Sequence, residues 1–490
     1  MTHLPVLIIV FYLVLAFLTP LLGRIKRLNT GWLAIGGTLA GLIMAAVLAW
    51  HVAQNGPYSY FPGQWQAPIG IEVRVDALTV LMTLLNNGVG LMVMLFALRG
   101  VKNEIGEGLT VWYNTIFFLL MAALNGLAMS FDLFNVFVFT EIGTITACAL
   151  VAIKPKRMCI RAALHYLILS TVGSGMILLA ISLIYMVTGH LNMGFISGEI
   201  AGAFALYPLN IYVAMGLFIV GFGIKAALFP LHIWLPDAHS SAPAPSSALL
   251  SGLVVKIYIV VLGRLLFQMF GVGIFENIPV PDVLIFLAIL GMLFGSISAM
   301  NQLEFKRMLA YSSVAQIGYI FLGLSLTTHE AMAGGLFHMV SHALTKSMLF
   351  LAAGAIYYKT GIKKTDELNG IGYQLPLVTA AVTVGAISMI GIPGTSGFVS
   401  KWMLAFGAFD AQRPLLVGVL LISSLLNATY YFPLISRAWF GHPRSSLRWD
   451  EPPRLMLLPI IVLMIGNLWF GIFPQTLRIL VVQVASMWLP

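Results

Sequence analysis

Charge is scarce in this sequence. Asp, Glu, Lys and Arg make up 9% of the 490 residues and hydrophobic residues make up 60%, whereas an ordinary soluble domain has about 25% charged and about 45–50% apolar residues. No soluble core needs so large a share of apolar side chains. The composition therefore excludes an ordinary soluble globular protein and indicates one that lies in a membrane.

Cysteine is almost absent as well. The 2 cysteines, Cys148 and Cys159, have a spacing that matches no metal knuckle and form no disulfide framework. We expect both to pack as small apolar side chains. The first apolar run lacks a small-residue cleavage site and precedes a basic loop, so we expect it to be kept as a helix rather than removed as a signal peptide.

The apolar residues occur in runs of about 20, the length of a helix that crosses a hydrocarbon layer about 30 Å thick. We expect no soluble domain, and we predict an ordered loop from His51 to Arg74. The runs predict an all-α membrane protein of about fourteen transmembrane helices, near residues 4–23, 32–50, 77–98, 111–129, 133–153, 163–187, 208–229, 246–269, 281–299, 308–326, 332–358, 377–409, 414–436 and 456–473.

The basic residues follow the predicted topology. A net charge of +9 could suggest nucleic acid, but the basic residues do not cluster with stacking aromatic residues. Loops after even-numbered spans hold only Arg74 and Arg413, so the positive-inside tendency places the odd loops in the cytoplasm and both termini on the outer face of a prokaryotic cell membrane. The odd loops hold Arg24, Lys26, Arg27, Arg99, Lys102, Lys154, Lys156, Arg157, Arg161, Lys306, Arg307, Lys359, Lys363, Lys364, Arg437, Arg444, Arg448 and Arg454.

Two spans are interrupted by proline and glycine. The interruptions run from Gly223 to Pro236, around Pro230, and from Gly391 to Lys401, around Pro393. Interrupted spans at corresponding positions indicate an inverted repeat with an ion site near the breaks. We therefore predict two inverted five-helix repeats with helices 7 and 12 broken. The expected domains are 1–110 (helices 1–3 and an outer loop), 111–270 (first repeat), 281–436 (second repeat) and 437–490 (helix 14 and tail).

Five basic residues lie inside apolar runs. An ionised side chain at the centre of a spanning helix costs about 2.5–3.5 kcal/mol, so these groups need partners, a hydrated interior, or release of their protons for part of the time. They are Lys225, Lys256, Arg264, Lys346 and Lys401.

The most direct partner for these cations is Glu141, an acidic residue inside the fifth span. We predict that it pairs with Lys225, just before the first break, where freed carbonyls and water can surround a charge. A static ion pair is the alternative, but apolar packing could replace such a pair with little loss of stability. Lys401, directly after the second break, is the symmetry counterpart of Lys225, and we predict that it is the last member of the path. The alternative is that it anchors the end of a half-helix at the membrane interface.

Lys256 lies near the middle of the eighth span, with Ser251 and Ser247 at earlier turns. Hydroxyl groups beside a lysine that can lose its proton make a workable relay. The alternative is a side chain that extends to the membrane surface, and we predict this behaviour for Arg264, which is nearer the end of the span.

The eleventh span carries His338, His342 and Lys346 at i, i+4 and i+8, on one face of a helix. Histidine accepts and donates protons near neutral pH, so we predict a relay. Structural histidines are the alternative. A haem is disfavoured because two histidines on one face of one helix cannot approach a ring from opposite sides. We expect no cofactor.

Near the first break stand His232, Asp237 and His239. They lack a known zinc spacing, so we expect no metal. We predict that they act with Pro230 and Pro393 as gating or helix-break support.

At these residues the sequence resembles the antiporter-like subunits shared by Mrp cation/proton antiporters, respiratory complex I and energy-converting membrane-bound hydrogenases, and it looks most like the D-type Mrp subunit. The M-type complex I subunit has glutamate where Lys401 stands. The resemblance extends from about residue 70 to 440 and is carried by Asp132 to Glu141, Gly223 to His239, Lys256, Ser341 to Lys346 and Gly391 to Lys401.

The resemblance implies a proton- or cation-translocating subunit of a multi-subunit membrane complex, with other hydrophobic subunits as partners. It leaves open whether the complex has a peripheral redox arm and whether Na⁺ is moved as well as protons. It implies ion transfer by the residues singled out above rather than catalysis by this chain. Alternatives are an M/N-type subunit of NADH-quinone oxidoreductase and, in a different class, a stand-alone solute transporter. The residues assigned to translocation are Glu141, Lys225, Lys256, His338, His342, Lys346 and Lys401.

Overall fold

The computed structural model describes residues 3–25, 29–442 and 449–489. Within these ranges, 13 helices are long and apolar enough to cross a membrane. The prediction of a multi-pass helical protein is therefore confirmed. Four basic residues used to predict the topology lie outside the described residues: Lys26, Arg27, Arg444 and Arg448.

The first half of the chain carries the only strands of the described part, β1 and β2, which pair antiparallel as a short hairpin. Its elements are α1 (Leu4–Leu22), α2 (Thr30–Asn55), β1 (Tyr58–Tyr60), η1 (Pro62–Gln64), β2 (Val73–Val75), α3 (Ala77–Ile105), η2 (Glu107–Leu109), α4 (Thr110–Met129), α5 (Leu133–Ala152), α6 (Arg157–Thr188), α7 (Met193–Leu206), α8 (Pro208–Lys225), α9 (Leu235–Ser241), α10 (Ala244–Leu249), η3 (Leu250–Val254), α11 (Val255–Arg264), η4 (Leu265–Phe270) and η5 (Val272–Glu276).

The second half is wholly helical in its described part. Its elements are α12 (Val280–Met300), α13 (Phe305–Ser325), α14 (His329–Thr360), η6 (Thr365–Glu367), α15 (Ile371–Gln374), α16 (Pro376–Ile390), α17 (Ser396–Asp410), α18 (Leu415–Phe440), α19 (Arg454–Ile472) and α20 (Gln475–Trp488).

Both predicted helix breaks are present. The seventh span ends as α8 at Lys225, and the chain becomes helical again only at α9. The twelfth span is two helices of 15 residues, α16 and α17. Two shorter helices, α7 and α20, were not predicted because each has only 14 residues, fewer than a spanning run needs. The predicted loop from His51 is also shorter, because α2 continues to Asn55.

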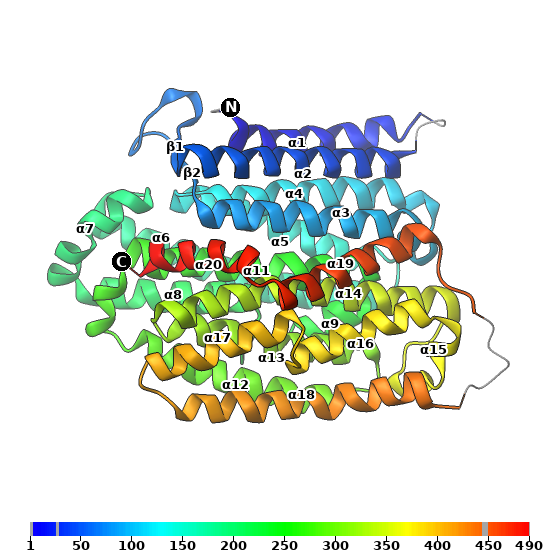
Figure 1. Cartoon of the computed structure of the whole chain (residues 1–490). Helices are drawn as coiled ribbons and strands as arrows, with labels where there is room; N and C mark the ends of the chain where they lie inside the picture. Colours follow the sequence, from blue (N-terminus) through cyan, green and yellow to red (C-terminus); the bar gives the residue numbers. More distant parts are fainter. Residues whose placement is uncertain (1–2, 26–28, 443–448, 490) are drawn as a thin grey trace.

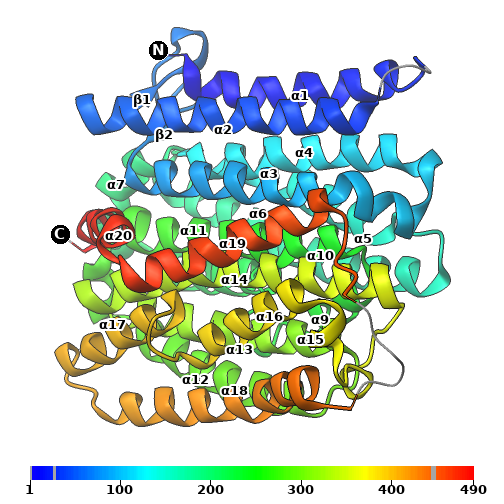
Figure 2. The same ribbon diagram turned by 45° about the vertical axis from the view of Figure 1, so that its right-hand side comes forward.

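The helices form a layered bundle. Figures 1 and 2 both place α1 and α2 along one side and α12 and α18 along the opposite side, with α3 and α4 beneath the first pair. The N- and C-terminal ends of the chain lie at the same end of the bundle (Figure 1). This agrees with an even number of membrane crossings.

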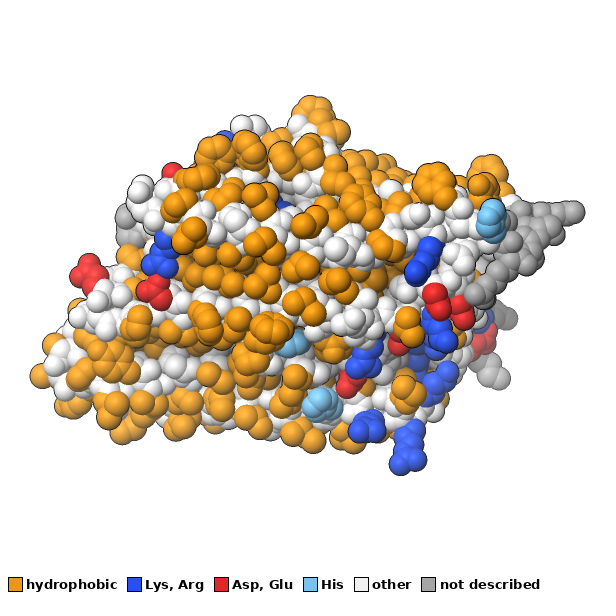
Figure 3. All heavy atoms as spheres, turned by 90° about the horizontal axis from the view of Figure 1, so that it is seen from below, with side chains coloured by type: hydrophobic (Ala, Val, Ile, Leu, Met, Phe, Trp, Pro, Cys, Tyr) orange, Lys and Arg blue, Asp and Glu red, His pale blue; other side chains and the backbone are white. Residues whose placement is uncertain are grey.

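The surface separates into an apolar belt and charged ends. In Figure 3 hydrophobic side chains cover most of the face formed by the side of α12 and α18, while Lys and Arg side chains gather at one end. Apolar side chains face lipid in membrane proteins, and basic residues concentrate on the cytoplasmic side. This face is therefore suited to contact lipid, as expected for a bundle that crosses a membrane.

The segment Ala244–Phe270 lies at the centre of this bundle, and its apolar window is fully buried. Two π-helical turns, η3 and η4, flank α11. Trp488 of α20 covers the end of α11: its ring lies 5.5 Å from that of Phe267, and a Cβ added to Gly263 would lie 2.5 Å from its indole. Segments far apart in sequence thus enclose the central helix.

Arg264, expected to reach the membrane surface, is only 2% exposed, so that prediction is wrong. Its guanidinium lies 3.3 Å from the carboxylate of Asp76, the residue that caps α3. It also donates to the backbone oxygens of Ala128 (3.0 Å) and Ser130 (3.3 Å). These acceptors bind the two terminal nitrogens of the guanidinium inside the bundle, so the charge is compensated without reaching water.

Removing the charge of Asp76 should destabilise the bundle. Asp76→Asn keeps a side-chain acceptor for the cap but leaves Arg264 buried without its counter-charge, which costs about 3–5 kcal/mol. We expect a clear fall in the thermal unfolding temperature of the detergent-solubilised protein, largely recovered in Asp76→Asn/Arg264→Met. Asp132→Asn, at the cap of α5, is the control. Equal losses in the single and double variants would contradict this account.

Candidate functional site

The predicted pair of Glu141 and Lys225 is present. Lys225 Nζ lies 3.8 Å from Glu141 Oε1 and donates a 2.7 Å hydrogen bond to Thr144 Oγ1. Ser174 of α6 donates to the carboxylate. The lysine side chain is 1% exposed, whereas that of Glu141 is 31% exposed. The cation is therefore inside the bundle, and the carboxylate lies at its side.

Backbone groups at the break after Lys225 have hydrogen-bond partners close by. Leu228 N donates to Gly223 O at 2.8 Å, and the indole of Trp234 donates to Ile224 O at 2.8 Å. Proline has no backbone N–H and interrupts a helix, which explains why the chain does not become helical again at Pro230. The result is a helix end held inside the membrane-spanning region, directly beside a lysine.

Lys256 lies on the central helix α11 and is fully buried, so it does not extend to the surface. Its Nζ donates to the backbone oxygen of Ser251 in η3. Ser251 Oγ in turn lies 3.0 Å from Ser313 Oγ of α13. Among the described residues no carboxylate forms an ion pair with Lys256, and its contacts lead toward the second half of the chain.

On the far side of Ser313, Lys346 of α14 continues this sequence of contacts. Its Nζ donates to Ser312 Oγ and to Leu309 O, both at 2.8 Å, and lies 3.4 Å from the hydroxyl of Tyr431. Ser312 and Ser313 are neighbours on α13. Ser312 thus contacts Lys346 directly, whereas Ser313 contacts Ser251, whose backbone oxygen accepts from Lys256.

The two histidines of α14 lie along the same face, as predicted. The His338 and His342 rings are nearly parallel, with centroids 6.2 Å apart. His338 Nδ1 lies 2.8 Å from Ser400 Oγ of α17, and Nε2 lies 2.9 Å from Gln316 Oε1 of α13. Neither ring nitrogen of buried His342 has a hydrogen-bond partner in the described part of the chain.

Lys401 closes the series at the second break. Its Nζ donates to Met389 O (2.8 Å) and Ile390 O (3.0 Å), carbonyls at the end of α16. It also donates to Ser424 Oγ at 3.0 Å and lies 4.4 Å from the centre of the Tyr319 ring. Freed helix carbonyls were expected around Lys225, but its Nζ donates to the Thr144 hydroxyl instead, and such carbonyls accept from Lys401 at the second break. Pro393 lies in the break itself, after Gly391 with φ of 95°.

These residues form what we call the central polar row. It crosses the bundle from α5 through α8, α11 and α14 to α17. Apart from Glu141, the exposed fraction of its members does not exceed 8%. The row consists of Glu141, Lys225, Lys256, Lys346, His342, His338 and Lys401.

The three residues predicted to support the first break do not lie together. His232 is 9% exposed and stacks on Phe229. Asp237 is at the surface, 3.1 Å from Arg307. His239 is fully buried against the ring of Phe350. Only His232 and His239 therefore have interior positions, and their gating role stays a prediction.

Sequence reasoning missed the polar residues that connect the row. These are single serine, threonine or glutamine residues within apolar helices: Thr144, Ser174, Ser313 and Gln316. Each forms a hydrogen bond to a row residue, or to a partner of a row residue, on a different helix. Only position on the inward face of a helix, which needs the packing to be known, distinguishes them from other polar residues.

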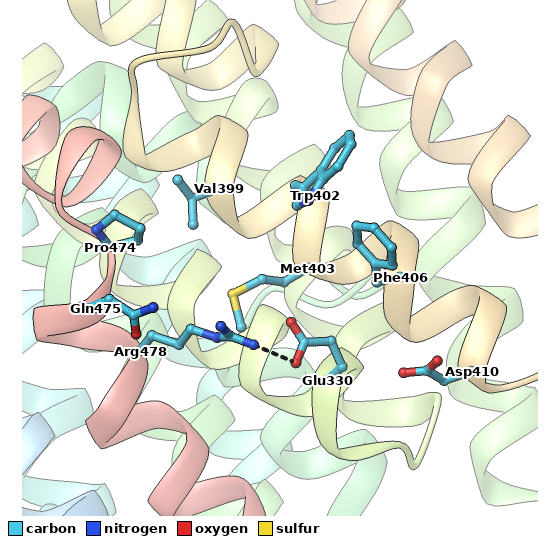
Figure 4. Close-up of a pocket in the computed structure, with 9 residues that line it drawn as sticks. All are labelled: Glu330, Val399, Trp402, Met403, Phe406, Asp410, Pro474, Gln475 and Arg478. Carbon is cyan, nitrogen blue, oxygen red and sulfur yellow. Dashed lines mark hydrogen bonds and ion pairs between the residues drawn. The ribbon is translucent and has the colours of Figure 1, made fainter.

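A separate hollow lies beside α17 (Figure 4). Its volume is about 480 Å³, and most of its wall is apolar, including Trp402, Met403 and Phe406. Arg478 of α20 points to Glu330 of α14 across it, at 3.4 Å. No member of the central polar row lines this hollow, so it is not part of the candidate path.

Comparison with known proteins gives a consistent picture. The family model for NADH:quinone oxidoreductase/Mrp antiporter transmembrane proteins matches residues 130–427. NADH-quinone oxidoreductase subunit N of Desulforudis audaxviator is 38% identical, with 99% of each chain covered. The D subunit of the Na⁺/H⁺ antiporter of Alkalihalophilus pseudofirmus is 30% identical, with 94% of this chain and 92% of the relative covered.

The fold also matches a solved structure. A chain of the membrane-bound sulfane sulfur reductase, an archaeal respiratory membrane complex, superimposes with a TM-score of 0.91 at 32% identity, covering 99% of this chain and 98% of that one. The match includes all helices that carry the central polar row.

Thr144 provides a test of how Lys225 is held. Thr144→Val removes the hydroxyl that accepts the lysine hydrogen bond, and a bond to a charged group is worth about 1.5–3 kcal/mol. We expect a several-fold loss of proton flux in proteoliposomes, with the protein still assembled. Thr146→Val is the matched control, since the Thr146 hydroxyl bonds only carbonyls of its own helix. Equal flux in both variants would remove Thr144 from the site.

Proposed function

Because the chain belongs to the NADH:quinone oxidoreductase/Mrp antiporter transmembrane family, we propose that it transfers protons along the central polar row as an antiporter-like subunit of a multi-subunit membrane complex. The observation that carries this proposal is the row itself. Buried titratable side chains occur on α8, α11, α14 and α17, with a partly exposed carboxylate on α5 at one end and Lys401, just after the second break, at the other.

The energetic cost of the row supports a functional role. Each of its four lysines costs about 2.5–3.5 kcal/mol on insertion scales if left unpaired. Of these four lysines, only Lys225 has a carboxylate within 4 Å in the described part of the chain. Apolar side chains at the other positions would avoid this cost, so their retention favours use of the charge over a static structural role.

Hydroxyl groups near two of the lysines support the transfer. Hydroxyls both donate and accept hydrogen bonds, so the Ser251–Ser313 pair near Lys256 and the Ser312 hydroxyl at Lys346 can take part in proton transfer. Buried polar atoms without a protein partner commonly bind internal water. His239 and His342 have such ring nitrogens and mark the positions where we expect water to complete the row.

The two broken helices support two equivalent halves, 111–270 and 281–436, with 1–110 and 437–490 outside them. In the first, α6 packs on α8, and a Cβ at Gly173 would come 2.9 Å from Gly221 O. In the second, α14 packs on α17, and a Cβ at Gly407 would come 2.4 Å from Ala331. In both halves the helix that carries the lysine thus crosses the preceding long helix at a glycine, and a repeated unit would have this feature twice.

The basic end of the bundle supports the orientation. Lysine and arginine concentrate on the cytoplasmic side of membrane proteins. We therefore place the end with Lys154 and Lys359 in the cytoplasm of a prokaryotic cell and both chain termini on the outer face.

The subunits that bind this chain, rather than the chain itself, identify the kind of complex. Its relatives include subunits of quinone oxidoreductases and of sodium/proton antiporters. Extraction in mild detergent followed by identification of the co-purifying subunits separates an Mrp-type antiporter, a membrane-bound hydrogenase and a quinone-linked complex. Purification as a fully active single chain would contradict the subunit role.

Lys256 tests whether the row transfers protons. Arginine keeps a positive charge but does not release its proton, so we expect Lys256→Arg to lower proton flux in proteoliposomes at least tenfold. Lys359→Arg, at a lysine that pairs with Asp450 outside the row, is the control. Wild-type flux in Lys256→Arg would mean that the charge has a fixed structural role.

Lys225 and Lys401 test whether the two halves act in series. If they do, alanine at either position stops transfer, and the double variant is no worse than a single one. We expect this result because one continuous row contains both residues. If each half conducted alone, each single variant would keep about half of the flux and the double variant none. Proton flux measured for all three variants distinguishes these models.

A further inference from the structure

A hollow at the basic end of the bundle lies outside the central polar row. Its volume is about 410 Å³, and it lies between the start of α2, the last turns of α3 and the start of α4. Leu455 of α19 also lines it. The polar residues of its wall are Asn29, Thr30, Arg99, Lys102, Glu107, Thr110 and Asn114.

Two tryptophans indicate the depth of this hollow in the membrane. Trp32, in its wall, is 55% exposed, and Trp112, in the first turn of α4, is 54% exposed. Tryptophan is enriched at the level of lipid headgroups, where its ring meets both chains and water. The helices α2 and α4 begin at Thr30 and Thr110. The hollow therefore opens in the headgroup layer.

The charges around the hollow favour an anion. Lys102 is paired with Glu107, but within the described ranges no carboxylate forms an ion pair with Arg99. The local balance of these three side chains is one positive charge. A guanidinium binds phosphate through two parallel N–H groups, so Arg99 supplies the strongest phosphate-binding group in the wall.

Neutral hydrogen-bonding groups and apolar groups complete the wall. Asn114 is 5% exposed and donates to Thr30 Oγ1 at 3.2 Å, which joins α4 to α2. Leu98 closes the contact between α2 and α3, because a Cβ at Gly31 would lie 2.3 Å from its Cδ1. A pocket with both polar and apolar residues in its wall at this depth suits the headgroup and glycerol region of a lipid.

We propose that this hollow binds the headgroup phosphate of an anionic phospholipid. Arg99 and Lys102 contact the phosphate, and Trp32 lies against the start of the acyl chains. The bound lipid connects α2 with α3, α4 and α19. This site is independent of proton transfer along the central polar row.

Lipid retention tests the proposal. The complex is purified in mild detergent as wild type, Arg99→Gln and Arg99→Gln/Lys102→Gln, and the bound phospholipid per chain is measured by native mass spectrometry. Each basic residue near an anionic surface contributes about fivefold in affinity. We expect retained anionic lipid to fall in the single variant and to be lost in the double variant. Arg161→Gln, an exposed basic residue at the same end, should retain wild-type amounts.

A second measurement identifies the ligand. Wild type is placed in nanodiscs of neutral phosphatidylcholine, and its thermal unfolding is followed after addition of either phosphatidylglycerol or inorganic phosphate. We expect stabilisation by phosphatidylglycerol that is reduced in the double variant. Equal stabilisation by inorganic phosphate would overturn the lipid assignment. Equal retention of lipid by the double variant and wild type would overturn the site.

Discussion

An ionised group inside a bundle surrounded by lipid must find its hydrogen-bond partners within the protein, and this requirement shapes the centre of the molecule. Lys225 ends α8, Lys401 lies against the carbonyls that α16 leaves free, and Lys256 follows a π-helical turn. Each departure from a regular α-helix thus lies beside a charge. The irregular backbone provides acceptors and room where a continuous helix offers neither.

Much of this arrangement could be predicted from the sequence because the signals are local. Apolar runs define the spans, and Pro230 and Pro393 mark the breaks. The pairing of Glu141 with Lys225 was predictable because a carboxylate inside an apolar span has few candidate partners. By contrast, α7 and α20 are too short for a window of about 20 residues.

The remaining interactions depend on packing between distant segments. Arg264 was expected at the surface because it lies near the end of its span, but Asp76 is separated from it by most of the first half of the chain. Gln316 and Ser400 could not be distinguished from other polar residues before the helices that carry them were placed beside His338.

The two ends of the row also differ in burial: the side chain of Glu141 is 31% exposed and Lys401 only 8%. A carboxylate partly exposed at the side of the bundle is better suited to contact with another membrane subunit than with lipid.

The packing of Trp488 against α11 also affects how the molecule is made. Transmembrane helices leave the translocation machinery in sequence order, so α11 enters the bilayer long before residue 488 has been synthesised. Its segment is apolar enough to remain there without its final neighbours. The central helix thus precedes one of its own neighbours into the bilayer, and Trp488 can pack on Gly263 only after α20 has been translated.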